Sequence, residues 1–160
     1  MKTLKLTPNV FFLILLFLSS WNTLKAQDQK LILAESKLTV FGTSNLHDWD
    51  IVAKVMNGKS NFVFDSNTLS DIKSLDFVVE AEQLLSGKSG MDSNTFKALN
   101  TKKYKTINYK LTDVTKISKV SANTYIVETK GDLTISGNTK NIPQTFTAVV
   151  SGKKVSLTGK

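Results

Sequence analysis

His47 is the only histidine in the chain and therefore the first residue to consider for chemistry. It lies in the segment 44–49 (SNLHDW), close to a serine hydroxyl and a carboxylate. A Ser/His/Asp triad requires three side chains that converge in space, whereas neighbours in an extended segment point in alternating directions. We therefore expect a hydrogen-bonding histidine at the start of a strand, and we predict no enzymatic activity.

Two pairs of carboxylates are the next candidates for catalysis. Asp48 and Asp50 form one pair, and Glu80 and Glu82 form the other. The i, i+2 spacing places both members of a pair on one face of a strand. Glycoside hydrolysis instead needs two carboxylates that face each other across a cleft. Because apolar residues alternate with these acids, we expect both pairs to face water.

The composition excludes several classes of site. The 160 residues contain no cysteine, which excludes thiol chemistry, disulfides and cysteine-ligated metals. One histidine cannot form a multi-histidine metal site. The EF-hand, Walker A and dinucleotide-binding motifs are absent. Residues 86–90 (SGKSG) contain a Gly-Lys-Ser triplet without the first glycine of a phosphate loop. We predict neither a metal nor a cofactor.

The charge of the chain raises the question of nucleic acid. All 21 basic residues are lysine, against 13 acids, and residues 102–110 combine four lysines with two tyrosines. Lysine with aromatic residues is the composition of a single-strand binding platform. The absence of arginine, the residue best suited to phosphate forks, argues against nucleic acid as a partner. We expect a solvated lysine-rich face with attraction to anionic lipid or phosphate head groups.

The first 26 residues predict a secretory signal peptide. Lys2 and Lys5 precede the apolar run 10–18 (VFFLILLFL), and a polar stretch leads to Ala26. The run is shorter than the roughly 20 apolar residues that span a bilayer, which favours a cleaved signal over an anchor. We therefore expect cleavage after Ala26, a mature domain over residues 27–160 without a membrane span, and a periplasmic or secreted location.

Apolar and polar residues alternate through most of the mature chain, which is the pattern of strands with one buried face. Turn signals separate the runs at 65–67 (DSN), 136–138 (SGN) and 151–153 (SGK), and Asn57-Gly58 predicts a hairpin turn. Residues 91–100 (MDSNTFKALN) have helical spacing instead. Short strands with close turns favour an antiparallel barrel or sandwich. The interior of a small barrel is either filled with side chains or holds one small ligand.

Several segments, in the same order, resemble the YceI-like family of secreted, polyisoprenoid-binding proteins. These segments are 36–44 (SKLTVFGTS), 46–49 (LHDW), 74–79 (SLDFVV), 91–99 (MDSNTFKAL), 103–107 (KYKTI) and 131–140 (GDLTISGNTK). The resemblance implies an all-β, lipocalin-like antiparallel barrel with one short helix. It also implies an apolar tunnel that binds an extended isoprenoid lipid without chemistry on it.

One departure from that family concerns the end of the chain. Family members continue with further strands, whereas this sequence ends at Lys160. Either the sequence is incomplete or the barrel lacks its C-terminal closing strands. We therefore expect an open sheet edge, which is prone to pairing with another chain.

The inward-facing positions of the alternating pattern would line the tunnel. They are Trp49, Ile51, Phe62, Phe64, Phe77, Val79, Ile107, Tyr109, Leu111, Leu133, Ile135 and Phe146, with Met91, Phe96 and Leu99 of the helix at one end. For each of them, core packing without ligand contact is the alternative.

The sequence is compatible with two functions. A secreted carrier of an isoprenoid or other long-chain lipid requires a cavity of about 300–1,000 Å³. A secreted β-sandwich interaction or envelope-assembly module requires instead an exposed apolar patch of more than a few hundred Å². The oligomeric state is open as well, with a dimer as one option.

Overall fold

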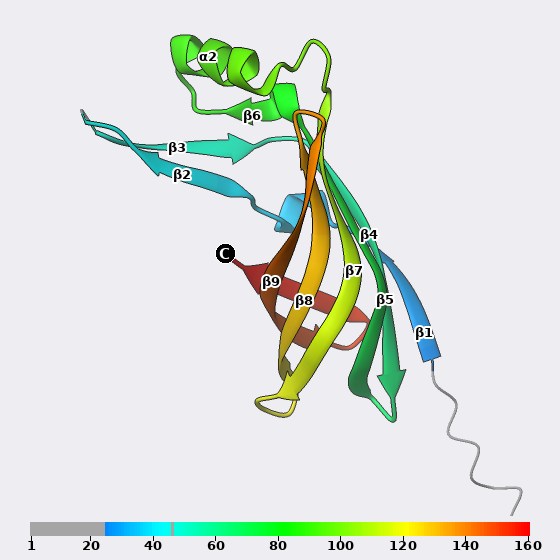
Figure 1. The fold of residues 1–160 in the computed structure, drawn as a ribbon. Helices are drawn as coiled ribbons and strands as arrows, with labels where there is room; N and C mark the ends of the chain where they lie inside the picture. The colour runs from blue at the N-terminus through cyan, green and yellow to red at the C-terminus, as the bar shows by residue number, and fades with distance from the viewer. Residues whose placement is uncertain (1–24, 46) are drawn as a thin grey trace, which may run out of the picture.

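The computed structural model describes residues 25–45 and 47–160. The predicted signal peptide, residues 1–26, lies outside the described residues except for its last two positions. The described residues form ten strands, one α-helix and two short 3-10 helices (Figure 1). Among these residues, no helix is long and apolar enough to cross a membrane.

A large antiparallel sheet forms the body of the protein, with the strand order β1-β4-β5-β7-β8-β9-β10. Its strands are β1 (Lys25–Lys30), β4 (Met56–Asp65), β5 (Thr68–Glu80), β7 (Thr106–Lys119), β8 (Thr124–Ile135), β9 (Asn138–Ser151) and β10 (Lys154–Gly159). The all-β antiparallel architecture predicted from the sequence is confirmed.

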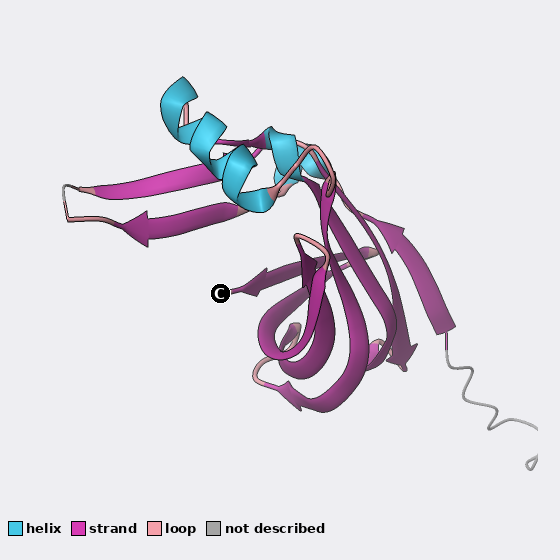
Figure 2. Ribbon diagram, turned by 45° about the horizontal axis from the view of Figure 1, so that its top comes forward, coloured by secondary structure: helices cyan, strands magenta, loops and turns pink. Residues whose placement is uncertain are grey.

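A smaller sheet with the order β2-β3-β6 and one helix lie at the upper end of this body in Figure 1. The elements of this part are β2 (Thr39–Thr43), β3 (Asp48–Ala53), β6 (Leu84–Leu85), the 3-10 helices η1 (Leu33–Glu35) and η2 (Ala81–Gln83), and the helix α2 (Ser89–Leu99). The β2–β3 hairpin projects away from the large sheet in both views (Figure 2).

The large sheet curls into a half-barrel whose edge strands are β1 and β10 (Figure 2). Side chains connect the two edge regions. The Gln29 side chain donates a hydrogen bond to the Lys153 carbonyl oxygen at 2.7 Å, and Lys154 forms an ion pair with Glu35. The curl therefore brings the two ends of the sheet close together, joined by side chains rather than by a strand ladder.

Three predicted turns are confirmed. Ser66 and Asn67 have φ values of 46° and 69°, and Ser136 and Gly137 have φ values of 49° and 76°. Positive φ at both central residues is the type I′ geometry that matches the twist of a two-residue hairpin. The third turn contains Gly152 with a φ of 58°.

The predicted hairpin turn at Asn57-Gly58 is wrong. Both residues lie inside β4, which pairs with β1 and β5 and not with β3. The chain bends earlier, at Lys54 and Val55. Gly58 instead lies at a close approach of two strands, because a Cβ at this position would be 3.1 Å from the carbonyl oxygen of Asp76.

Helix α2 confirms the predicted helix but begins two residues earlier and ends one residue earlier, before Asn100. Asn100 has the left-handed conformation, with a φ of 51°, which is a common way to end a helix. Asp92 in the first turn accepts hydrogen bonds from the backbone N–H of Ser86 at 2.8 Å and from its hydroxyl at 2.6 Å. These bonds fix the loop that precedes the helix.

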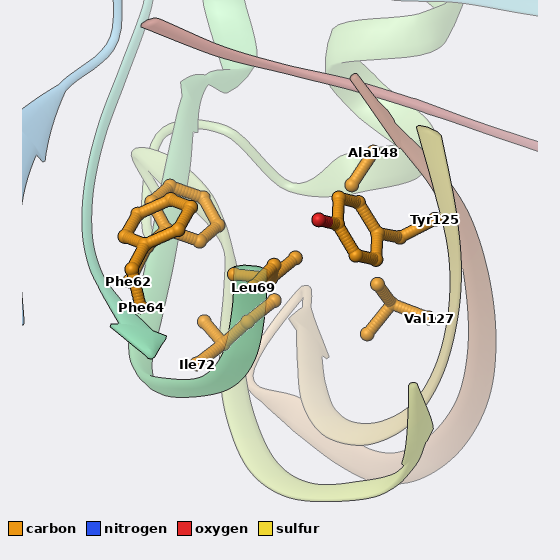
Figure 3. Packing of buried hydrophobic residues seen from close by; sticks show 7 residues of the cluster. All are labelled: Phe62, Phe64, Leu69, Ile72, Tyr125, Val127 and Ala148. Carbon is orange, nitrogen blue, oxygen red and sulfur yellow. The ribbon is translucent and has the colours of Figure 1, made fainter. Parts of the chain in front are cut away.

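The buried side chains form two clusters. The lower cluster lies between the walls of the half-barrel (Figure 3) and consists of Phe62, Phe64, Leu69, Ile72, Tyr125, Val127 and Ala148. The upper cluster lies where the small sheet meets β4 and β5, and consists of Ile51, Ala53, Met56, Val79 and Leu84.

Candidate ligand-binding face

Inward-facing side chains extend along the strands of the half-barrel beyond the lower cluster. Tyr125, Val127 and Ala148 point into the curl (Figure 3), and β8 and β9 pair without a register shift. Side chains two residues apart, and direct cross-strand partners, share a face of a sheet. Leu133 of β8 therefore faces inward, as does its partner Tyr109 on β7.

The same pairing places further apolar residues on the inward face above the lower cluster, and we call this set the inner wall. It consists of Phe77, Tyr109, Leu133, Ile135, Ile142 and Phe146.

The residues of the inner wall are not fully covered. Ile135 is 36% exposed, and the other five are half-buried. In the lower cluster, by contrast, Val127 on the same strand is completely buried. The inner wall is thus an apolar surface that faces the interior of the curl and that no side chain of the described residues fully covers.

Tyr109 is the most constrained residue of the inner wall. Its ring lies against Gly131, where a Cβ would come within 2.3 Å of the tyrosine Cζ. The ring also packs edge-on against Phe146, with 6.5 Å between the centroids. Only glycine at position 131 lets the tyrosine ring lie flat on β8, since any larger residue would displace it.

The hydroxyl of Tyr109 has a defined partner. It lies 3.4 Å from Oγ1 of Thr129. Thr129 is 2% exposed and donates its own hydroxyl proton to the Gln144 carbonyl oxygen at 2.8 Å. A hydroxyl has one proton to donate, so Tyr109 is the donor to Thr129. This chain of hydrogen bonds provides a partner for the polar end of Tyr109 on an otherwise apolar wall.

The structure divides the predicted lining residues into three groups. Seven belong to or pack on the upper cluster: Trp49, Ile51, Phe77, Val79, Met91, Leu99 and Ile107. Three belong to or pack on the lower cluster: Phe62, Phe64 and Leu111. The remaining five lie outside both clusters: Phe96, Tyr109, Leu133, Ile135 and Phe146.

Sequence reasoning missed several inward-facing residues. Tyr125 and Val127 are in the same alternating run as Leu133, and Ile142 is in the same run as Phe146, so the pattern already contained them. Leu69 and Ile72 of β5 lack such a signal, because β5 and β4 pair with register shifts in this part of the hairpin.

His47 lies at the exposed turn between β2 and β3. The Ser44 hydroxyl and backbone N–H donate to the His47 carbonyl oxygen at 2.9 and 3.2 Å. Asp48 and Asp50 are exposed, as predicted. Among residues 25–45 and 47–160, no three histidine or acidic side chains form a group that could hold a metal ion.

A hollow of about 370 Å³ lies between β5 and β7, where their pairing ends. The two strands are paired only from Asp76↔Lys110 to Glu80↔Thr106. The hollow is lined by Asp71, Ile72, Lys73, Leu111, Thr112, Asp113 and Val114. Three of these, Ile72, Leu111 and Val114, belong to or pack on the lower cluster. The hollow therefore reaches from the surface toward that cluster.

Comparison with known families now identifies the domain. The model of the YceI-like domain matches residues 31–160, which is most of the chain. The protein belongs to the YceI-like family. Members of this family are known as polyisoprenoid-binding proteins, and they are binding proteins rather than enzymes.

The fold of the domain has a counterpart among solved structures. BcnA of Burkholderia cenocepacia is similar in fold, with a TM-score of 0.63 and 18% identity over 79% of this chain and 76% of that protein. The YceI protein of Campylobacter jejuni aligns at 14% identity and a TM-score of 0.40, over 92% of this chain and 60% of that protein. A search of curated protein sequences found no match.

Proposed function

We propose that this YceI-like protein binds an extended isoprenoid-type lipid along its inner wall and carries or sequesters that lipid outside the cytoplasm. The observation that carries the proposal is the inner wall itself, an inward-facing apolar surface that remains half-exposed. Each CH₂ group that moves from water to an apolar surface contributes about 0.8 kcal/mol, so a long hydrocarbon would gain strongly from this wall.

The two clusters define where the lipid would lie. The lower cluster closes the bottom of the half-barrel, since Phe62 and Tyr125 are 2% and 1% exposed. The chain of the lipid would extend along Tyr109, Leu133 and Phe146, with the half-buried residues of α2 above it. No step of chemistry is required of the protein, only burial of the lipid.

The proposed location follows from the predicted signal peptide. Cleavage after Ala26 would leave residues 27–160, which include the whole of the domain match at residues 31–160. A long hydrocarbon cannot diffuse freely through the aqueous space between two membranes. A protein that covers the hydrocarbon with an apolar wall would allow it to cross this space.

Binding of farnesol, a neutral isoprenoid, tests the proposal. We expect Leu133→Gln on the inner wall to weaken farnesol binding about tenfold, because it removes roughly half the burial energy of a leucine. Val149→Gln is the matched control, since Val149 lies on the outer face of β9 and is 41% exposed. Equal farnesol affinity of the two variants, measured by calorimetry, would contradict binding at the inner wall.

One observation favours the alternative, a secreted interaction module. Phe41 on the projecting β2–β3 hairpin is 78% exposed, and Val40 beside it is 42% exposed. An exposed large aromatic side chain is typical of interaction surfaces. Under this alternative, Phe41→Ser would abolish association with an envelope partner while farnesol binding would be absent in the unmodified protein.

A further inference from the structure

The β2 strand is an edge strand without the usual protection against pairing. It is the terminal strand of the small sheet, and its five residues (TVFGT) include no charge. Charged side chains commonly keep edge strands from pairing with other chains. β1 has three charged residues and β10 has one. Among the edge strands of the described residues, β2 is therefore the only one of more than two residues that lacks a charge.

The backbone of β2 presents unpaired polar groups at this edge. The Leu38 carbonyl oxygen accepts a hydrogen bond from the Ala53 N–H at 3.0 Å, so the backbone groups of Leu38 point toward β3. β2 and β3 pair without a register shift, and successive residues of an antiparallel strand direct their backbone groups to opposite sides. The N–H and carbonyl groups of Thr39, Phe41 and Thr43 therefore point to the free edge.

Apolar side chains lie beside the free edge on both faces of the hairpin. Phe41 is on one face and is 78% exposed, and Val40 is on the other and is 42% exposed. The Trp49 ring shares the face of Val40 and covers Gly42, where a Cβ would come within 2.1 Å of the indole Cζ2. The hairpin projects away from the large sheet in both views, which leaves these side chains accessible (Figures 1 and 2).

The charges of the hairpin are divided between its two ends. Lys37 and Lys54 lie at the base, where β2 begins and β3 ends, whereas Asp48 and Asp50 lie nearer the tip. All four side chains are exposed. In the described part of the chain, none of the four forms an ion pair. A second hairpin that runs antiparallel to the first would place its acidic tip beside this basic base, so the charges are complementary to those of a second copy.

We propose that the free edge of β2 pairs in antiparallel fashion with the β2 edge of a second copy of this chain, with Phe41 on the two-fold axis. Thr39 then stands opposite Thr43 of the second copy. All the residues that point to the free edge meet each other in this register, with two hydrogen bonds for each pair of residues. The inference does not depend on lipid binding.

This register also matches the side chains on both faces. Directly opposite residues share a face of a sheet, so the two Phe41 rings meet as an aromatic pair. On the other face, Val40 stands opposite Gly42 of the second copy and meets the Trp49 ring that covers it. A two-fold contact repeats each of these interactions, and it joins the two small sheets into one continuous sheet.

Sedimentation equilibrium of the protein and of two variants at the axis tests the inference. We expect a dimer for the unmodified protein. Phe41→Glu and Phe41→Lys should each raise the dissociation constant about tenfold, because like charges then stand directly opposite each other and the aromatic pair is lost. An equimolar mixture of the two variants should recover the dimer, since opposite charges then meet at the axis.

Two further variants separate the edge from general effects. Thr43→Pro removes an N–H that points to the free edge and leaves the bonds between β2 and β3 in place, since proline is tolerated at such positions. We expect it to weaken the dimer as well. Val149→Glu is the matched control, because Val149 is 41% exposed on the outer face of β9, and it should leave the dimer intact. Farnesol binding, measured by calorimetry, should be the same in Phe41→Glu as in the unmodified protein.

Each contrary outcome would overturn the inference. A monomer at every concentration would reject the pairing and favour a different protein as the occupant of the hairpin. A dimer that persists in Phe41→Glu and Thr43→Pro would use another surface. Failure of the mixed variants to recover the dimer would reject Phe41 as the axis. Equal weakening in Val149→Glu would show a general effect of charge. Absence of farnesol binding with a dimer that behaves as expected would reject the proposed function alone.

Discussion

Gly131 and Tyr109 show how closely single residues define the inner wall. A methyl group at position 131 would lie 2.3 Å from the tyrosine Cζ, so Gly131→Ala must displace the ring or shift β8. We expect a loss of about 2 kcal/mol in the free energy of unfolding, as for an overpacked core, measured by urea denaturation. Gly90→Ala is the control, since a Cβ there meets nothing within 4 Å and alanine favours the helix; a similar loss in both variants would contradict the account.

Asp92 is a single residue that makes a pH-dependent contribution to the stability of the folded protein. The Ser86 hydroxyl and then the Ser86 backbone N–H donate to its carboxylate and lower the pKa of Asp92 below its ordinary value of 3.8. Because the folded-state pKa is the lower one, the stabilisation is complete above the ordinary value. It is lost as the pH falls through the lowered pKa.

We therefore expect Asp92→Asn to reduce the melting temperature at pH 6 and to reduce it less at a pH below the lowered pKa, where the carboxylate of the unmodified protein is protonated. Melting followed by circular dichroism at both pH values measures this difference. The same reduction at the two pH values would show that the charge of Asp92 contributes nothing through Ser86.

At the scale of elements, a hydrogen bond connects the segment after α2 to η2. Thr101 is 2% exposed and donates its hydroxyl proton to Glu82 at 2.9 Å, and Lys105 lies 3.6 Å from the same carboxylate oxygen. We expect Thr101→Val, which keeps the shape of the side chain, to cost about 1 kcal/mol of stability. A double-mutant cycle with Glu82→Gln measures the coupling, and additive effects of the two changes would contradict it.

Turns illustrate what the sequence could predict about these elements. The turns at 65–67 and 136–138 were predictable because their sequences tolerate positive φ, which a tight hairpin needs. Asn57-Gly58 has the same chemistry but lies within β4. A dipeptide alone does not reveal whether its glycine serves a turn or, as at Gly58, a close approach of two strands.

The sequence predicted which face of the sheet the residues of the candidate site lie on, but not how deeply each is buried. The alternating pattern identified Leu133, Phe146 and Tyr109 as inward-facing. This prediction was possible because successive side chains of a strand point to opposite faces, a property that depends only on the local backbone. It could not separate Leu133, which is half-buried, from Val127, which is fully buried on the same strand. That difference depends on the curl of the whole sheet and on which strands lie across the interior.

The whole molecule combines a tightly packed lower cluster with a half-exposed inner wall. We therefore expect changes in the lower cluster to affect mainly stability and changes in the inner wall to affect mainly ligand binding. We expect Phe62→Ala in the lower cluster to cost about 3–5 kcal/mol of stability, because Phe62 is 2% exposed. Leu133→Ala on the half-exposed inner wall should cost clearly less and should weaken farnesol binding more than it weakens folding. Urea denaturation and calorimetry on both variants measure the two effects. An equal loss of stability in the two variants would show that the inner wall is as tightly packed as the lower cluster.

We propose that a lipid occupies the interior of the half-barrel. Native mass spectrometry of the protein purified from a bacterial envelope, followed by extraction into organic solvent, tests it most directly. We expect a bound isoprenoid in near-equal stoichiometry that is released on extraction. A folded protein with the mass of the polypeptide alone would contradict the account and would favour an interaction module centred on the exposed Phe41.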